Sequence, residues 1–391
     1  MEDVVIVSAC RTPVGSFMGG LSSLTAPQLG AVVVAEAVRR AAIKKEDVQE
    51  VIMGNVLTAG EGQAPARQAA IFAGLPESVE CMTVNKVCGS GLKAVMLASQ
   101  AIRLGDANII VAGGMESMSN TPYLLDKARA GFRLGHGQVV DSMIRDGLWD
   151  VYNDYHMGNA AELCAKECAV PRDAQDEFAV ASYQRAQEAT NKGWFKDEIV
   201  PVSLKTREGE VKVDRDEDPF KTNFEKIPKL KPVFQKDGSV TAANASKIND
   251  GAAAVVVMSA SKAKEMDLKP MARVIAFASA AKKPEWFTTA PADVIPKTLA
   301  KAGLKDSDID LYEVNEAFAV VTLAVNKILG LDPQKVNVHG GAVALGHPIG
   351  ASGARILVTL LYALRQRGKK RGLAAICIGG GEASGMIVEM L

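Results

Sequence analysis

Gly-Ser-Gly-Leu-Lys-Ala-Val at residues 89–95 opens a predicted helix, which is followed by a buried strand and by Gly-Gly-Met-Glu-Ser at 113–117. The same order returns near the C-terminus. There, Ala-Ser-Gly-Ala-Arg-Ile-Leu at 351–357 leads through a strand at 374–378 to Gly-Gly-Gly-Glu-Ala-Ser at 379–384. A glycine-rich chain can produce this likeness by coincidence, but two occurrences of helix, strand and glycine turn favour duplication of one half of the protein.

The composition predicts a compact, layered α/β protein. The chain has 391 residues, a length that indicates two or three domains. Hydrophobic residues make up 48% and aromatic residues only 5%, so small residues, including 35 glycines, fill space where backbones approach closely. Because 45 basic residues balance 45 acidic ones, nothing indicates nucleic-acid binding or an acidic disordered tail.

Short β-branched runs alternate with Ala-rich helical patterns. Continuous apolar strands between helices indicate parallel or mixed sheets that are covered on both faces. The predicted strands are 4–7, 51–53, 109–112, 253–258, 274–277 and 374–378, and the predicted helices are 26–42, 91–104, 173–191, 292–302, 316–329 and 353–367.

Residues 119–249 differ in character from the two halves. Most of the Tyr and Trp residues lie here, together with charged patches at 214–218 and 226–231, and long apolar runs are few. Such a segment is typical of an insertion draped over the core, where binding loops lie.

Several features bear on location and cofactors. The N-terminus enters a strand without the basic start of a signal peptide, and no run of about 18 apolar residues predicts a membrane span. Six cysteines in a chain of this length favour a reducing compartment, the cytoplasm, in which one cysteine can be catalytic. Cys164 and Cys168 have the spacing of one metal-binding face, but no further ligands complete a site, so two packed helical cysteines are expected. The sequence contains no phosphate-binding glycine loop, so it gives no support for nucleotide chemistry.

Cys88 lies in Asn-Lys-Val-Cys-Gly-Ser-Gly-Leu-Lys at 85–93, a turn that leads into a helix. The glycines leave its sulfur approachable, and a helix N-terminus is expected to lower the pKa of the thiol. A small buried cysteine before an ordinary helix is the equally weighted alternative.

His347 lies in a second glycine-rich loop at 340–353, in which Pro348 makes the turn rigid. A surface or core histidine rarely needs so many glycines. Cys377 lies at a strand end before a glycine turn, where α/β proteins place functional groups, although a core cysteine fits the pattern too. Asn315, in Val-Asn-Glu-Ala-Phe, follows a strand-like run at 309–314 and precedes a predicted helix. An ordinary helix N-cap is the alternative to a functional role for this residue.

The four motifs around Cys88, Asn315, His347 and Cys377, taken in chain order, resemble those of the thiolase family. Arg-Thr-Pro at 11–13, Tyr-His-Met-Gly at 155–158 and Asn-Ala-Ser at 244–246 match as well, so the resemblance covers essentially the whole chain. It implies an α/β thiolase fold, in which two duplicated halves form α-β-α-β-α layers with an inserted loop domain. The expected division is a first half at 1–118 completed by 250–269, a loop domain for coenzyme A at 119–249, and a second half at 270–391.

The resemblance also implies chemistry. Cys88 would be the nucleophile, His347 would accept its proton, and Cys377 would move a proton at the α-carbon of the second thioester. His347 and a water held by Asn315 would form one oxyanion hole, and the backbone N–H groups of Cys88 and Gly379 the other. Coenzyme A thioesters are substrates here, with no metal or other cofactor implied.

The implied binding residues lie mainly in the insertion. His156 and Ser246 match positions near the pantetheine arm, Lys221 is a candidate phosphate contact, and Met157, Phe318 and Phe287 would wall the acyl pocket.

The implied function is acetyl-CoA C-acetyltransferase, which joins two acetyl-CoA into acetoacetyl-CoA and CoA, as a homodimer or homotetramer. The nearest alternative is a broader 3-ketoacyl-CoA thiolase of fatty-acid oxidation. A non-catalytic protein that binds CoA or lipid would not need all four reactive residues. A ketoacyl synthase typically has two histidines where this chain has one His and one Cys.

Overall fold

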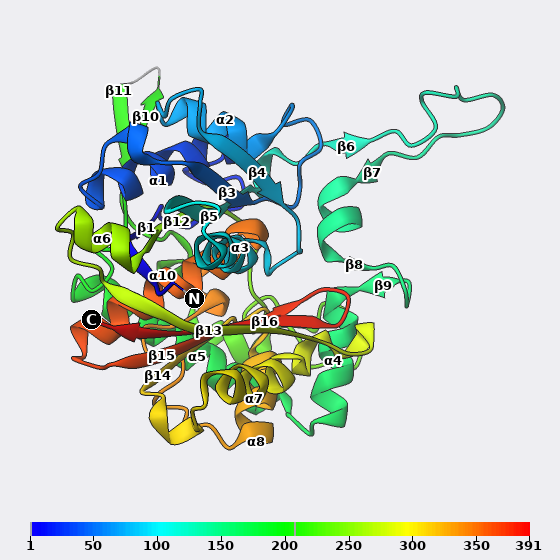
Figure 1. Cartoon of the computed structure of the whole chain (residues 1–391). Helices are drawn as coiled ribbons and strands as arrows, with labels where there is room; N and C mark the ends of the chain where they lie inside the picture. Colours follow the sequence, from blue (N-terminus) through cyan, green and yellow to red (C-terminus); the bar gives the residue numbers. More distant parts are fainter. Residues whose placement is uncertain (1, 207–208) are drawn as a thin grey trace.

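The computed structural model describes residues 2–206 and 209–391 and places the strands of both halves in one continuous sheet (Figure 1). The two parts of the sheet meet where β1 pairs with β13 over Val5 and Ile6. The strands of the first part are β1 (Val4–Arg11), β3 (Glu50–Gly54), β4 (Glu80–Val84), β5 (Ile109–Ser117) and β12 (Asn249–Ser259), with the short β2 (Gly15–Ser16) beside β12, and those of the second part are β13 (Ala272–Ala281), β14 (Leu311–Val314), β15 (Arg371–Ile378) and β16 (Glu382–Met390).

The same topology occurs in both parts. In the first, β3 runs parallel to β5, β5 is antiparallel to β12, and β12 is antiparallel to β1. In the second, β14 runs parallel to β15, β15 is antiparallel to β16, and β16 is antiparallel to β13. The predicted duplication of a half is therefore confirmed.

Together with the helices that separate and cover them, the two parts of the sheet form five layers. Helices α3 (Ser90–Leu104) and α10 (Ile349–Gln366) pack on each other between them. Helices α1 (Ala26–Arg40), α2 (Pro65–Phe72) and α6 (Ala260–Glu265) cover the outer face of the first part, and α7 (Pro291–Ala302) with α8 (Ala319–Leu329) covers that of the second. The predicted α-β-α-β-α order is confirmed (Figure 1).

The repeated glycines explain how the two central helices meet. A Cβ on Gly91 would lie 2.8 Å from the backbone nitrogen of Ala354, and a Cβ on Gly353 would lie 2.4 Å from that of Leu92. The two helix openings therefore touch through their backbones, which brings the turn before each helix to one place.

The segment between β5 and β12 runs over the core. It contains α4 (Met157–Glu167), α5 (Arg172–Asn191) and three small hairpins, β6–β7 (Tyr123–Leu124, Val140–Asp141), β8–β9 (Trp149–Asp150, Tyr155–His156) and β10–β11 (Val202–Thr206, Gly209–Val213). The β6–β7 arm projects from the body (Figure 1). Arg11 of β1 ties the segment to the core through ion pairs with Glu198 at 2.6 Å and Asp216 at 2.7 Å, with all three side chains fully buried. The exact division at 119–249 stays a prediction.

Two details of the sequence interpretation are wrong. Gly113 and Gly114 do not form a turn but lie inside β5. A Cβ on Gly113 would lie 2.0 Å from the carbonyl oxygen of Ala253, and one on Gly114 would lie 2.1 Å from that of Gly350, so these glycines admit a strand and a helix. The helix expected from 316 begins only at Ala319, and the Glu316 carboxylate before it accepts a hydrogen bond from Val343 N of the short helix α9 (Ala342–Leu345).

Candidate active site

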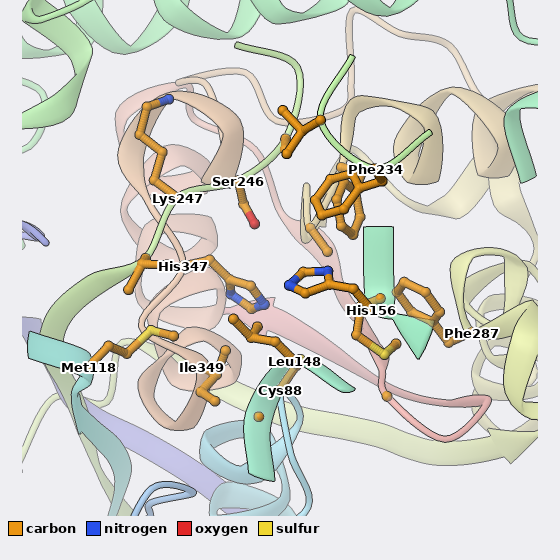
Figure 2. Close-up of a pocket in the computed structure, with 18 residues that line it drawn as sticks. Cys88, Met118, Leu148, His156, Phe234, Ser246, Lys247, Phe287, His347 and Ile349 are labelled. Atoms are coloured by element: carbon orange, nitrogen blue, oxygen red, sulfur yellow. The ribbon is translucent and has the colours of Figure 1, made fainter. Parts of the chain in front are cut away.

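A mostly apolar cavity of about 280 Å³ lies where the two halves and the inserted segment meet. Figure 2 shows the imidazole rings of His156 and His347 pointing toward one another across it, whereas Lys247 points away. Eight of the predicted site residues line the cavity: Cys88, His156, Met157, Ser246, Phe287, Phe318, His347 and Gly379.

The backbone before Cys88 is strained. Val87 has φ +46°, a left-handed conformation that a β-branched residue rarely adopts and that costs roughly 1–3 kcal/mol. Local hydrogen bonds hold it: Val87 N donates to Asn85 Oδ1 at 3.0 Å, and Lys86 N donates to Ser90 Oγ at 2.8 Å. The strained turn presents Cys88 to the cavity immediately before α3.

Burial, not the helix end, dominates the titration of the Cys88 thiol. Burial raises its pKa to about 11, and hydrogen bonding from the backbone of Gly379 and of Cys88 itself only partly opposes this. The expected net lowering by the helix N-terminus is therefore wrong. At neutral pH the thiol keeps its proton until a neighbouring base removes it.

His347 is the candidate for that base. The Ser352 hydroxyl donates to the Pro348 carbonyl at 2.8 Å, so its oxygen is free to accept from His347 Nδ1 at 2.6 Å. This arrangement places the ring proton on Nδ1 and leaves a lone pair on Nε2, which has no hydrogen-bond partner among the described residues. Burial, and then the charge of Arg355, lowers the pKa of His347 to about 3, so the imidazole is neutral.

The loop that carries His347 is fixed from several directions. The backbone N–H of His347 donates to Asn249 Oδ1 at 2.9 Å. Gly346, at φ +107°, approaches Asn249 so closely that a Cβ would lie 2.4 Å from its amide carbon. Glycine is required there because a side chain would push the loop away from Asn249.

Cys377 lies beneath the cavity rather than on its surface. It is fully buried in a cluster with Met157, Phe287 and Phe318. Burial raises the pKa of its thiol well above the usual value, and the nearby Cys88 raises it further. The structure therefore brings the two reactive cysteines together.

Asn315 is also buried, and within the part of the chain that the structure describes no group bonds to either end of its side-chain amide. A buried amide normally has partners, which a water or a substrate oxygen can supply. Its predicted role in holding a water stays a prediction.

The implied acyl-binding residues form an aromatic wall. His156 stacks on Phe234 at 4.8 Å between ring centroids, Phe234 meets Phe318 edge-on at 6.2 Å, and Phe318 meets Phe287 at 6.5 Å. His156 also caps α4, because its Nδ1 accepts from Gly158 N at 3.1 Å. Sequence reasoning missed Phe234, because nothing in its local sequence distinguishes it from a core aromatic residue.

Lys221 does not reach this cavity. Its ammonium donates to Ser16 Oγ at 2.6 Å, beside the short turn Asp218–Phe220, and its side chain is otherwise exposed. The Asp218 carboxylate, bonded to Asn249 and Ser16, holds this turn against β2 and β12, and the role of Lys221 as a phosphate contact stays a prediction.

Two buried glutamates position the site, and sequence reasoning did not single them out. Glu116 accepts from the backbone N–H groups of Val56, Leu57 and Gly350 at 2.9–3.1 Å. Burial raises its pKa to about 7, although these bonds oppose the shift. Glu316 accepts from Ser182 Oγ, Asn337 Nδ2 and Val343 N. Glu116 lies in the Gly-Gly-Met-Glu-Ser segment at 113–117 and Glu316 in Val-Asn-Glu-Ala-Phe at 314–318. The acidic residue inside each motif is therefore the sequence signal that could have identified them.

Within 2–206 and 209–391, no cluster of three His, Cys, Asp or Glu side chains is arranged to hold a metal ion. Cys164 and Cys168 lie with their sulfurs 3.8 Å apart at the end of α4. None of the described helices has the length and apolar character needed to cross a membrane.

Comparison with known proteins gives consistent likenesses over the whole chain. Residues 4–261 match the family model "Thiolase, N-terminal domain" and residues 268–390 match "Thiolase, C-terminal domain". The chain is 55% identical to acetyl-CoA acetyltransferase 1 of Arabidopsis thaliana, covering 100% of this chain and 95% of that protein. It is also 55% identical to acetyl-CoA acetyltransferase of Cupriavidus necator, with 100% of both chains covered. The crystal structure of Acat5 thiolase from Ascaris suum in complex with coenzyme A superposes with a TM-score of 0.95 at 47% identity, covering 100% of both chains.

Proposed function

This chain belongs to the thiolase family, and we propose that it is an acetyl-CoA C-acetyltransferase that joins two acetyl-CoA into acetoacetyl-CoA and CoA, and catalyses the reverse cleavage. The observation that carries the proposal is the convergence of Cys88, a neutral His347 with a free Nε2 and the buried Cys377 at one apolar cavity. Relatives named acetyl-CoA acetyltransferase that match the chain from end to end support the substrate.

In the first half-reaction, Cys88 Sγ attacks the carbonyl carbon of acetyl-CoA. Its proton passes to His347 Nε2, the only ring nitrogen with a free lone pair. The bond between the carbonyl carbon and the CoA sulfur breaks, and His347 returns the proton to that sulfur. Acetyl-Cys88 and free CoA result.

In the second half-reaction, the Cys377 thiol gives its proton to His347 Nε2, and the resulting thiolate takes a proton from the methyl group of a second acetyl-CoA. The enolate carbon attacks the acetyl-Cys88 carbonyl, and the Cys88 sulfur leaves as a thiolate that takes the proton back from His347, which restores both thiols. A proton donor to each developing oxyanion lowers the barrier. The backbone N–H groups of Cys88 and Gly379, which already oppose the raised pKa of the thiol, supply donors beside the acetyl group.

The test is a chain-length profile of thiolysis. We expect kcat/KM to be highest for the C4 3-ketoacyl-CoA and to fall steeply toward C8, because Phe287 and Phe318 close the acyl end of the cavity. Efficient turnover of C8 to C16 substrates would overturn the short-chain assignment and support the broader 3-ketoacyl-CoA thiolase. A protein that never acquires a covalent acetyl group would instead be a binding protein.

The partners of the proposed enzyme are acetyl-CoA, acetoacetyl-CoA and CoA, without nucleic acid or membrane. We propose a cytoplasmic location, which six free cysteines support, and a place in fatty-acid metabolism. A homodimer or homotetramer is supported by β4, one of the two edge strands of the described sheet, in which Met82 is 45% exposed and next to which Phe72 of α2 is 59% exposed. Light scattering on the purified protein distinguishes these states from a monomer.

A further inference from the structure

Two turns from opposite halves form the floor of the active site. The turn 85–89 carries the nucleophile, and Gly379–Gly381 joins β15 to β16 as a hairpin whose last strand begins at Glu382. They are packed directly together: a Cβ on Gly89 would lie 2.3 Å from Ile378 Cδ1, and a Cβ on Gly379 would lie 3.6 Å from Val87 Cγ1.

Each turn is costly to hold in place. Val87 keeps an unfavourable left-handed backbone. The hairpin contains three consecutive glycines, of which Gly380 and Gly381 have φ +89° and +86°. Glycine loses more conformational freedom on ordering than any other residue, so this hairpin needs outside contacts to stay in one position.

One ion pair joins the outer rims of the two turns. The Lys86 ammonium bonds to the Glu382 carboxylate, with 22% and 38% of the respective side chains exposed. Lys86 is two residues before Cys88, and Glu382 is three residues after Gly379, whose backbone N–H interacts with the Cys88 sulfur.

We infer that Lys86 and Glu382 are a pair of positioning residues, which hold the Gly379 N–H against Cys88 and so set the geometry of acetyl transfer. The inference deepens the proposed function and rests on it. If the pair acts through position, Lys86→Met and Glu382→Gln shift the Cys88 pKa in the same direction, whereas a direct effect of charge on the sulfur would shift it in opposite directions.

The experiment compares Lys86→Met, Glu382→Gln and the charge-reversed double variant Lys86→Glu/Glu382→Lys in the full-length protein. A half-exposed ion pair has a modest effect, so each single variant should lower kcat about two- to fivefold with little change in KM. Each should also move the pH profile of Cys88 alkylation by iodoacetamide to higher pH, because the Gly379 hydrogen bond weakens. The double variant should recover most of both losses.

The matched control is Lys262→Met, which breaks an ion pair with Glu265 on the remote helix α6 and should leave both readouts unchanged. Single variants that match the wild type in kcat and in alkylation would overturn the inference, as would a charge-reversed variant no better than the worse single variant. Alkylation of Cys88 needs no turnover, so failure of this inference is distinguishable from failure of the proposed function.

Discussion

The turn that carries Cys88 and the loop that carries His347 occupy the same place in the two halves, each just before a central helix, yet they are built differently. The Cys88 turn is partly exposed, strained at Val87 and held mainly by its own side chains. The His347 loop is buried throughout and bonded to Asn249 and Ser352. Duplication supplied two equivalent positions, of which one holds Cys88, the proposed nucleophile, and the other holds His347, the proposed base.

The largest expected effect is at the strained turn. Cys88→Ser replaces a thiol with a hydroxyl that ionises far less, and should reduce kcat by at least about 10³-fold while the fold is preserved. Steady-state thiolysis with circular dichroism as the control measures this. If iodoacetamide labelled Cys10 or Cys81 in preference to Cys88 in the wild type, the assignment of the nucleophile would fail.

The buried loop should respond almost as strongly. His347→Gln keeps a polar side chain but removes the Nε2 lone pair, so kcat should fall by about 10²–10⁴-fold. Because the Cys88 thiol has a pKa raised to about 11, rising pH should partly restore the variant's alkylation and acetylation rates. A variant whose rates do not increase with pH contradicts the role of His347 as the base.

Cys377→Ala separates the two half-reactions. The variant should still acetylate Cys88, because that step needs no proton transfer at the α-carbon. Condensation and exchange of the methyl protons should fall by about 10²-fold or more. Normal condensation by Cys377→Ala would remove this residue from the mechanism.

The interior of the fold could be predicted from the sequence, but several boundaries could not. The strands at 109–112 and 374–378 were found because they are continuous apolar runs buried on both faces. Helix α10 begins at Ile349 and not at 353, because Gly350 N donates to the distant Glu116 carboxylate, a contact that local sequence does not reveal.

The same limit applies to the site. Cys88 and His347 have glycine signatures because backbones approach closely around them. The aromatic wall, and the position of Lys221 beside Ser16, depend on how the insertion folds back over the core, and no local pattern encodes this.

A graded effect is expected at the acyl end. Phe287→Ala enlarges the cavity and should raise kcat/KM for C6 and C8 substrates by about 10- to 200-fold per methylene accommodated, since one methylene is worth roughly 1–3 kcal/mol. Acetylation of Cys88 should be unchanged. If the variant gains no activity on longer chains, Phe287 does not close the pocket and Met157 becomes the residue to replace.

The smallest effect is on stability and distinguishes the buried loop from the exposed turn. Because the pKa of His347 is lowered from 6.5 to about 3, the unfolded chain binds a proton there that the folded protein does not. The neutral imidazole therefore makes its full contribution to the free energy of unfolding above pH 6.5, and this contribution is lost as the pH falls toward 3. The urea midpoint should fall less between about pH 7 and pH 5 in His347→Gln than in the wild type, whereas Cys88→Ser should follow the wild type. Equal pH slopes for wild type and His347→Gln would contradict the buried, neutral ring.

The most direct test of the division of labour between the two halves is to locate the covalent acetyl group. Wild type and Cys377→Ala are mixed with acetyl-CoA, quenched in acid within the first turnover and digested for peptide mass spectrometry. We expect acetyl on Cys88 in both proteins, with one CoA released per site. Acetyl on Cys377 of the wild type, or CoA release without acetyl on either cysteine, would contradict it.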